Sequence, residues 1–270
     1  MSIVLCVPFV YPHHKHIPHL MEFYAHNKAK HDLHLHWEMG RPLHKVQGNA
    51  VEYAREIGAS HVLFTEHDQW AYPMDGLDIL LEADKEVVGL PTYMRKYPYL
   101  PMCMHKIDKS LTLIGQHRNL RSFFPTEPMV TTDLITWAFT LVKMSVFDKL
   151  DEAGLNPWQW NEVPTDSYFC QYCEDLGIER WINASYFVNH GDVPKQQVSY
   201  HRRMYDAIAA ANGLFAPGSL PKDQAIEQED DPRFEHYQTQ LEKMKADAAE
   251  QQQMAAQAEA AEKEYEEAVA

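Results

Sequence analysis

The two carboxylates of Glu66 and Asp68 stand one residue apart, directly after the apolar and β-branched residues 62–65. Residues 62–65 predict a buried strand. If that strand continues, side chains two residues apart point the same way. Two oxygen ligands on one side suit a hard divalent cation, which keeps waters and bridges phosphates. A helix N-terminus with an acidic cap is the alternative interpretation of this stretch.

A third candidate ligand, His190, stands far along the chain, after the predicted strand 180–188 and before Gly191. An imidazole at a strand end can join carboxylates in a metal site. A hydrogen-bonded surface histidine explains the same position without a metal. Further histidines follow the first predicted strand, in a proline-broken loop at 8–18, where we expect solvent-exposed side chains: His13, His14, His16 and His19.

These side chains need a sheet to position them, and the order of predicted elements favours an α/β fold with a largely parallel sheet. Three strand–helix alternations occupy the first 70 residues or so. In open α/β sheets, ligands bind at the carboxyl ends of the strands, where the two carboxylates would lie. The predicted strands are 3–7, 32–37, 62–68, 86–91, 111–114, 133–143 and 180–188, and the predicted helices are 17–30, 43–57, 73–83, 145–150 and 165–176.

The composition is that of a globular chain: 45% of its 270 residues are hydrophobic, which is enough to bury a full core. No apolar run of about 18 residues predicts a transmembrane helix, and the N-terminus lacks the charged region of a signal peptide. Four cysteines favour a reducing compartment, so a cytoplasmic protein is expected. Cys170 and Cys173 form a Cys-x-x-Cys with no second pair nearby, and zinc or redox chemistry is therefore not favoured.

The formal net charge of −15 is unevenly distributed. Residues 222–270 carry 5 Lys/Arg against 14 Asp/Glu and are rich in Ala and Gln, which predicts a helical or disordered tail through which the chain could oligomerise. Residues 1–221 form the predicted folded domain. Within it, residues 93–121 hold six basic residues and one acid. Such a patch can meet the phosphates of a nucleotide or a nucleic acid, and a solvated basic face is an equal alternative.

The ordered series of motifs resembles the GT-A fold glycosyltransferases, especially the small soluble enzymes of bacteria and bacteriophages. The resemblance covers roughly residues 1–195. It implies a GT-A (Rossmann-like) mixed, mostly parallel sheet flanked by helices. It also implies metal-dependent transfer of a sugar from a nucleotide-diphosphate sugar to an acceptor hydroxyl. The segments that carry it are Gly48-Asn49-Ala50, residues 58–68, residues 136–147, residues 165–170 and residues 188–191.

The resemblance implies a metal site and a catalytic acid. The family's Asp-x-Asp becomes Glu66-x-Asp68. Of these two acids, Asp68 is the stronger candidate for a direct ligand. Together with His190 they would bind Mn²⁺ or Mg²⁺. The family's Glu-Asp pair at a helix start becomes Thr165-Asp166, and Asp166 would be the catalytic carboxylate on the acceptor side. A helix N-terminus favours the ionised carboxylate, which suits a general base. Thr165 or Asp166 could also be the N-cap of that helix.

Candidate substrate contacts come partly from the resemblance and partly from side-chain chemistry. Pro8 and Phe9 match the family's nucleotide-base loop, and Asn49 stands where the family contacts the donor. Aromatic rings can stack on a base or a sugar, and basic groups can neutralise a diphosphate. The expected contacts to a UDP-sugar or other nucleotide-sugar donor are Pro8, Phe9, Tyr11, Asn49, Glu66, His67 and Arg95, and those to the acceptor are Trp137, Trp158 and Trp160.

Several alternatives stay open at this point. The acceptor could be a saccharide, a protein hydroxyl or a hydroxylated base in phage DNA. From another functional class, a non-catalytic sugar- or nucleotide-binding module of the same fold is favoured by the departures at Glu66 and Thr165. A nucleotidyltransferase is expected to carry a glycine-rich, basic loop after the first strand, and residues 8–12 do not form one.

Overall fold

The computed structural model describes residues 1–9, 16–39, 42–70, 72–93, 101–115, 119–123, 125, 127–159, 164–186 and 188–190 of the 270-residue chain. The chain divides into two units, Met1–Ser219 and Leu220–Ala270, and every described residue lies in the first. The predicted tail at 222–270 lies outside the described residues. The division into a domain at 1–221 and a tail therefore stays a prediction.

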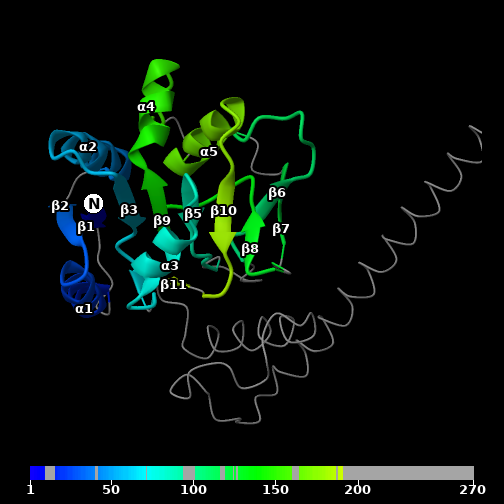
Figure 1. Ribbon diagram of the computed structural model, residues 1–270. Helices are drawn as coiled ribbons and strands as arrows, with labels where there is room; N and C mark the ends of the chain where they lie inside the picture. The colour runs from blue at the N-terminus through cyan, green and yellow to red at the C-terminus, as the bar shows by residue number, and fades with distance from the viewer. Residues whose placement is uncertain are drawn as a thin grey trace, which may run out of the picture. The chain divides into compact units, whose positions relative to one another are not determined.

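A seven-stranded sheet runs through the described residues (Figure 1). In chain order its strands are β1 (Ser2–Phe9), β2 (Asp32–Met39), β3 (His61–Thr65), β5 (Val87–Gly89), β8 (Met129–Thr131), β9 (Phe139–Lys143) and β10 (Arg180–Asn183). Their spatial order is β2-β1-β3-β9-β5-β10-β8. Strand β1 is parallel to both neighbours and β5 is parallel to β10, whereas β9 runs antiparallel between β3 and β5, and β8 is antiparallel to β10. Five strands therefore point the same way, and the predicted mixed, mostly parallel α/β sheet is confirmed.

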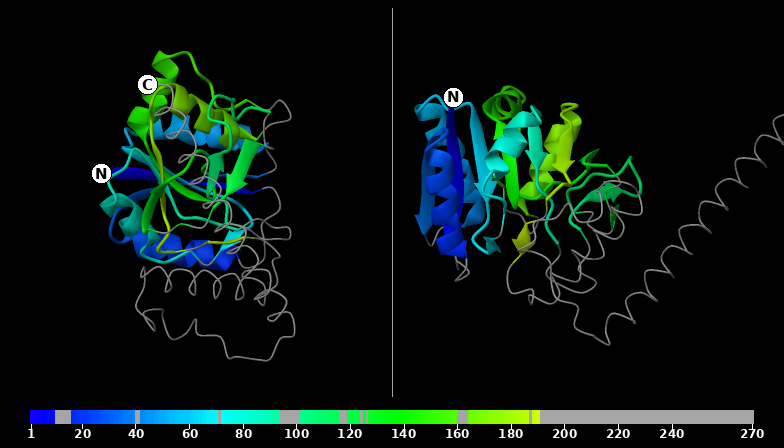
Figure 2. Two further views of the ribbon diagram at one scale, coloured as in Figure 1. Left: turned by 90° about the vertical axis from the view of Figure 1, so that its right-hand side faces the viewer. Right: turned by 60° about the horizontal axis from the view of Figure 1, so that its bottom comes forward.

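Helices cover both faces of this sheet (Figures 1 and 2). They are α1 (His16–Lys28), α2 (Leu43–Glu56), α3 (Gly76–Glu82), α4 (Met144–Glu152) and α5 (Thr165–Asp175). Val4 and Cys6 of β1 face the core under α2, α4 and α5, whereas Ile3 and Leu5 face the core under α1 and α3. This alternation follows from the two-residue period of a strand. It fixes which helices lie on which side of the sheet.

Two short strand pairs lie outside the main sheet. Strand β4 (Gln69–Trp70) pairs with β11 (Asn189–His190), and β6 (Met104–Lys106) pairs with β7 (Leu120–Ser122), both antiparallel. None of these four short strands, nor β8, is predicted from the sequence, because two or three residues carry too little periodicity to be recognised. No helix in the part of the chain that the structure describes has the length and apolar character needed to cross a membrane.

The predicted helix at 43–57 is confirmed almost residue for residue as α2. One face of α2 is fully buried, with Val46, Ala50 and Ala54 at 0% exposure. The spacing of these residues is the i, i+4 repeat of an amphipathic helix. Gly58 follows with φ +64°, the left-handed conformation that glycine adopts most readily at a helix end.

The predicted loop at 8–18 is wrong at both ends, because β1 runs to Phe9 and α1 begins at His16. Pro8 is tolerated in the strand for a topological reason. The pairing of β1 with β3 ends at Cys6, while the pairing with β2 continues to Phe9. Pro8 therefore has a neighbouring strand on one side only, which is where a residue without an N–H is accepted.

The predicted strand at 111–114 is also wrong. Asp108 Oδ1 accepts hydrogen bonds from the backbone N–H (2.9 Å) and the hydroxyl (2.7 Å) of Ser110, which forms a local turn. The N–H of Leu113 donates to Gln171 Oε1 at 2.6 Å instead of to a neighbouring strand. Side-chain hydrogen bonds thus replace the strand ladder here.

Two other predicted strands are shorter than expected. The stretch 133–143 becomes a strand only at Phe139, and the stretch 180–188 ends as β10 at Asn183. Before β9, the carboxylate of Asp133 accepts a hydrogen bond from Lys106 N at 2.7 Å, and Trp137 is packed into the core. These tertiary contacts hold residues 133–138 away from a continuous ladder.

Candidate metal centre and active site

The site begins where β3 leaves the sheet. The strand ends at the buried Thr65, whose hydroxyl donates to the carbonyl of Cys6 at 3.1 Å. A turn follows, closed by the hydrogen bond from Gln69 N to the carbonyl of Glu66 at 3.3 Å. The predicted continuation of the strand to Asp68 is therefore wrong. The strand reverses into a turn because β9, the neighbour of β3, pairs with it only as far as Thr65.

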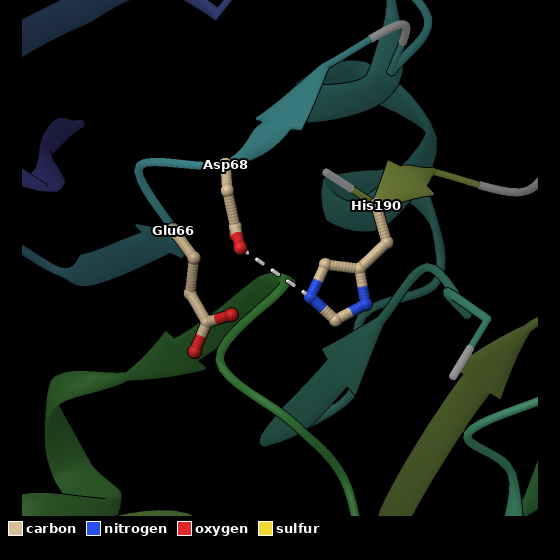
Figure 3. Close-up of side chains that lie close together, drawn as sticks. All are labelled: Glu66, Asp68 and His190. Carbon is tan, nitrogen blue, oxygen red and sulfur yellow. Dashed lines mark ion pairs between the residues drawn. The ribbon is translucent and has the colours of Figure 1, made fainter. Parts of the chain in front are cut away.

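The turn nevertheless brings the predicted ligands together. Oxygens of Glu66 and Asp68 and a ring nitrogen of His190 all lie within 4.8 Å of one another. Asp68 and His190 are 6% and 9% exposed, and Glu66 is half-buried. Figure 3 shows the carboxylate of Asp68 and the imidazole of His190 pointing toward each other. His190 Nε2 lies 3.7 Å from Asp68 Oδ2.

Backbone pairing holds His190 in this place. Strand β11 pairs with β4 so that His190 lies opposite Gln69, next to Asp68 in the chain. The other ring nitrogen, Nδ1, lies 2.7 Å from the carbonyl of Tyr93. Because a carbonyl can only accept, Nδ1 carries a proton, and in the neutral imidazole Nε2 is the nitrogen with the lone pair.

This donor set fits a divalent cation. The two carboxylates suit Mn²⁺ and Mg²⁺, whereas an imidazole is a ligand more typical of transition metals. A metal-binding histidine nearly always donates its second ring nitrogen to a carbonyl or carboxylate, as His190 does to Tyr93. Asp68, Glu66 and His190 would therefore hold the cation, and their assignment as ligands remains a proposal.

His16 belongs to the surroundings of this site, contrary to the expectation of an exposed loop histidine. It is the first residue of α1 and is 0% exposed. Its Nδ1 is hydrogen-bonded to the carbonyl of Gln69, and its ring lies edge-on to Phe9, with centroids 5.9 Å apart. Burial lowers the pKa of His16, against the opposing effect of that hydrogen bond. The ring is therefore neutral at pH 7.

Asp166, the predicted catalytic carboxylate, lies in the first turn of α5. Pro164 is the N-cap, so the prediction that Thr165 or Asp166 occupies this position is wrong. Part of the residue is exposed, but its carboxyl group is enclosed, and this desolvation raises the pKa of Asp166 to about 6. Hydrogen bonds from backbone N–H groups, including Ser167 N at 2.8 Å, oppose the rise.

Two hydrogen bonds fix the start of α5 at the same edge of the sheet as the carboxylates. Trp137 Nε1 donates to Thr165 Oγ1 at 3.0 Å, and Thr165 Oγ1 donates to Gln47 Oε1 at 2.8 Å. Phe139 pairs with Thr65, so Trp137 lies just beyond the end of β3. Sequence reasoning missed Gln47, although a glutamine on the otherwise apolar face of α2 was a usable signal.

The predicted donor contacts are partly placed. Pro8 and Phe9 lie at the carboxyl end of β1, and His67 is half-buried in the turn between the two carboxylates. Asn49 donates its amide to Glu38 Oε1 at 2.8 Å, an acceptor that His36 Nε2 also contacts at 3.1 Å. Tyr11 and Arg95 lie outside the described residues.

Two of the predicted acceptor tryptophans, Trp137 and Trp158, are not exposed platforms. Trp137 is 2% exposed and packs against Phe64 at 4.5 Å and Phe169 at 4.6 Å between ring centroids. Trp137 is therefore a core residue, because its ring fills the space between the sheet and α5. Trp158 is half-buried, with its ring 5.7 Å from that of Trp137. Trp160 lies outside the described residues.

An exposed aromatic side chain lies near the carboxyl ends of β1 and β2. Trp37, near the carboxyl end of β2, is 56% exposed, although it is on the same face of the strand as the buried Leu33. Its ring meets that of Phe9 edge-on at 5.4 Å. The residues that bury this face of β2 at Leu33 do not extend to Trp37. The two-residue period of the sequence cannot predict where that burial ends.

The basic stretch at 93–121 is less available to phosphates than its composition suggests. Lys106 is buried and its ammonium pairs with Glu174, while Lys109 pairs with Asp133. Both carboxylates come from outside the stretch, so tertiary pairing neutralises these two charges.

Solved structures resemble this chain at low identity. A197 from STIV has a TM-score of 0.44 and 11% identity, with 70% of this chain and 85% of that chain covered. TarS 1–349 from S. aureus has a TM-score of 0.38 and 13% identity, with 83% and 68% covered. A protein from Desulfovibrio desulfuricans G20 named a nucleotide-diphospho-sugar transferase has a TM-score of 0.36 and 11% identity, with 79% and 95% covered. At these values the likeness assigns no activity to this chain.

No protein family and no curated protein matches the sequence. Membership of the GT-A glycosyltransferases therefore stays a prediction. The chemistry of the site itself has to support any function.

Proposed function

We propose that this chain transfers a sugar from a nucleotide-diphosphate sugar to an acceptor hydroxyl, with a divalent cation as cofactor. The observation that carries the proposal is the cluster of Glu66, Asp68 and His190 at the carboxyl edge of the sheet. This edge is where open α/β sheets bind their ligands. The implied GT-A resemblance agrees with the same assignment.

The donor fits the side of the edge formed by β1, β2 and β3. A cation held by the cluster would neutralise the diphosphate leaving group as a Lewis acid. Phe9 and the exposed Trp37 lie together at the ends of β1 and β2 and offer an aromatic surface for a base. Asn49 and Glu38 add hydrogen-bonding groups on the same side.

Asp166 is proposed as the general base. A pKa of about 6 leaves its carboxylate ionised at pH 7 and close enough to neutrality to accept a proton from an acceptor hydroxyl. Its place at the start of α5 is fixed by the hydrogen bonds from Trp137 to Thr165 and from Thr165 to Gln47. A positioned carboxylate of this kind is what transfer requires and simple binding does not.

A saccharide is the acceptor that we favour over a hydroxylated DNA base. Of the basic residues at 93–121, Lys106 and Lys109 are already paired with carboxylates, which leaves fewer cations for the phosphates of a DNA acceptor. A cytoplasmic location and oligomerisation through residues 222–270 remain proposals from sequence.

The decisive experiment is calorimetric titration with a panel of nucleotide sugars, in Mn²⁺ and in chelator. Tight, metal-dependent binding of one donor supports the transferase and names the sugar. Incubation of that donor with simple glycans and hydroxymethylated DNA then tests transfer. Donor binding with neither transfer nor donor hydrolysis would favour the non-catalytic module instead. Failure to bind any donor would contradict the transferase.

A further inference from the structure

One face of α1 is hydrogen-bonded to the segment that follows the turn carrying Glu66 and Asp68. The ring of His16 is hydrogen-bonded to the carbonyl of Gln69, and His19 Nε2 lies 2.9 Å from the carbonyl of Tyr72. Further along the helix, Asn27 Nδ2 donates to the carbonyl of Met74 at 2.8 Å. The helical spacing of 16, 19 and 27 places these donors on one side of α1. The helix therefore holds the backbone carbonyls of Gln69, Tyr72 and Met74.

Gln69 connects this clamp to all three candidate ligands. It follows Asp68 directly, and its side-chain amide donates to Glu66 Oε2 at 3.2 Å. Its backbone lies opposite His190 in the pairing of β4 with β11. Gln69 is 0% exposed, so these contacts are made away from solvent. A shift of the Gln69 backbone would move each ligand relative to the other two.

A histidine at position 16 is energetically unfavourable unless its hydrogen bond is needed. The inward face of α1 is otherwise built from Leu20, Phe23 and Asn27, and His16 is as buried as they are. A fully buried imidazole costs free energy that an apolar side chain would not. Because the carbonyl of Gln69 can only accept, His16 Nδ1 carries the proton of this bond.

We propose that His16 is a positioning residue of the metal site, which sets the ligand geometry by holding the Gln69 carbonyl. The proposal rests on the proposed function, because it requires that Glu66, Asp68 and His190 bind a divalent cation. His16 itself is not a ligand. Groups hydrogen-bonded to a metal ligand typically change metal affinity by about 10–100-fold, and His16 acts on the residue next to such a ligand.

The test measures Mn²⁺ binding to the full chain without donor, from the electron paramagnetic resonance signal of free Mn²⁺. His16→Leu removes the hydrogen bond and should weaken Mn²⁺ binding at least about tenfold. His16→Asn places an N–H close to the position of Nδ1 and should restore affinity to within about threefold of wild type. His19→Leu is the matched control, because it removes the equivalent bond one helical turn further from the ligands.

Thermal unfolding in chelator separates positioning from a general loss of stability. We expect His16→Leu and His19→Leu to lower the melting temperature similarly, while only His16→Leu weakens Mn²⁺ binding. Should His16→Leu fail to fold, His16→Gln replaces it, since its amide reaches the position of Nε2 rather than Nδ1 and should also lose affinity.

Two results would overturn the proposal. If wild type binds Mn²⁺ and the variants at 16 and 19 alter affinity equally or not at all, the positioning role fails and the proposed function stands. If wild type binds no Mn²⁺, the metal-dependent function fails together with the positioning role.

Discussion

His190 Nε2 and Asp68 Oδ2 lie 3.7 Å apart, although His190 is the last residue that the structure describes and Asp68 follows the third strand of the sheet. The pairing of β11 with β4 creates this proximity. The candidate metal site is therefore a product of the folded chain and should disappear with it.

Asp68→Asn should weaken Mn²⁺ binding about 100-fold or more, because the loss of a direct ligand exceeds the effect of an outer contact. At a Mn²⁺ concentration 100 times its Kd, wild type should gain about 2.7 kcal/mol of stability, and the variant should gain almost none. Calorimetry and urea unfolding with and without Mn²⁺ measure both effects. Asp84→Asn is the control, since this exposed residue pairs with Lys143 and its φ of 47° suits asparagine. Equal Mn²⁺ affinity in wild type and Asp68→Asn would contradict the metal assignment.

Asp166→Asn should abolish transfer while the fold survives. In wild type, transfer should rise with pH with an apparent pKa near 6, because a base must be deprotonated. Activity across pH 5–8 checks this, with Asp175→Asn in the last turn of the same helix as the control. An activity profile without a rise near pH 6 would argue against Asp166 as the base.

The same pKa predicts how stability changes with pH. The pKa of Asp166 is raised in the folded protein, so the folded state binds more protons than the unfolded state between about pH 4 and pH 6. The stabilisation is complete below about pH 4 and is lost as the pH rises through about 6. Urea unfolding of wild type and Asp166→Asn across this range should show a smaller decline in the variant. Parallel curves would mean that Asp166 titrates normally.

The hydrogen bonds from Trp137 to Thr165 and from Thr165 to Gln47 should act as a unit. Trp137→Phe should lower the free energy of unfolding by about 1 kcal/mol beyond the effect of lost packing. Thr165→Val should lower it by about 1–3 kcal/mol, because Gln47 is 2% exposed and loses its hydrogen-bond donor. The double variant should cost less than the two single changes together. Denaturant unfolding of the four proteins gives the coupling. Strict additivity would show that the two bonds are independent.

Gly89→Ala should destabilise the sheet by about 1–3 kcal/mol. An added Cβ would lie 2.5 Å from Thr140 Oγ1 and 3.1 Å from the carbonyl of Phe139, and that backbone belongs to the neighbouring strand β9. Gly48→Ala is the comparison, because the atoms nearest to its added Cβ belong to the side chain of Trp158, at 3.2 Å and beyond, and alanine favours the helix. Urea unfolding should show that Gly89→Ala is much less stable than Gly48→Ala. The reverse order would contradict the close packing of β5 on β9.

Truncation after Pro221 should leave Mn²⁺ and donor binding unchanged, since the candidate ligands and Asp166 all lie before residue 191. Circular dichroism of the truncated chain, followed by the same calorimetric titrations, tests this expectation. An unfolded product would place part of residues 222–270 in the folding unit and refute the predicted boundary.

Much of the local structure was predictable because it depends on neighbouring residues. The repeat of Val46, Ala50 and Ala54 and the glycine at 58 define α2, and the apolar run at 62–65 defines β3. Glu66, Asp68 and His190 could be proposed as partners because carboxylates and an imidazole after strands are suited to one cation. The turn at Glu66 could not be predicted, since it depends on where β9 stops pairing with β3.

The sequence by itself determined which side chains were available for chemistry and the periodicity of the elements that carry them. Only the tertiary structure decided which of them meet. It buried His16 against Gln69, placed Trp137 in the core and left Trp37 exposed. The physical reason is that periodicity records which face of an element is apolar, whereas burial and distance depend on which other element covers that face.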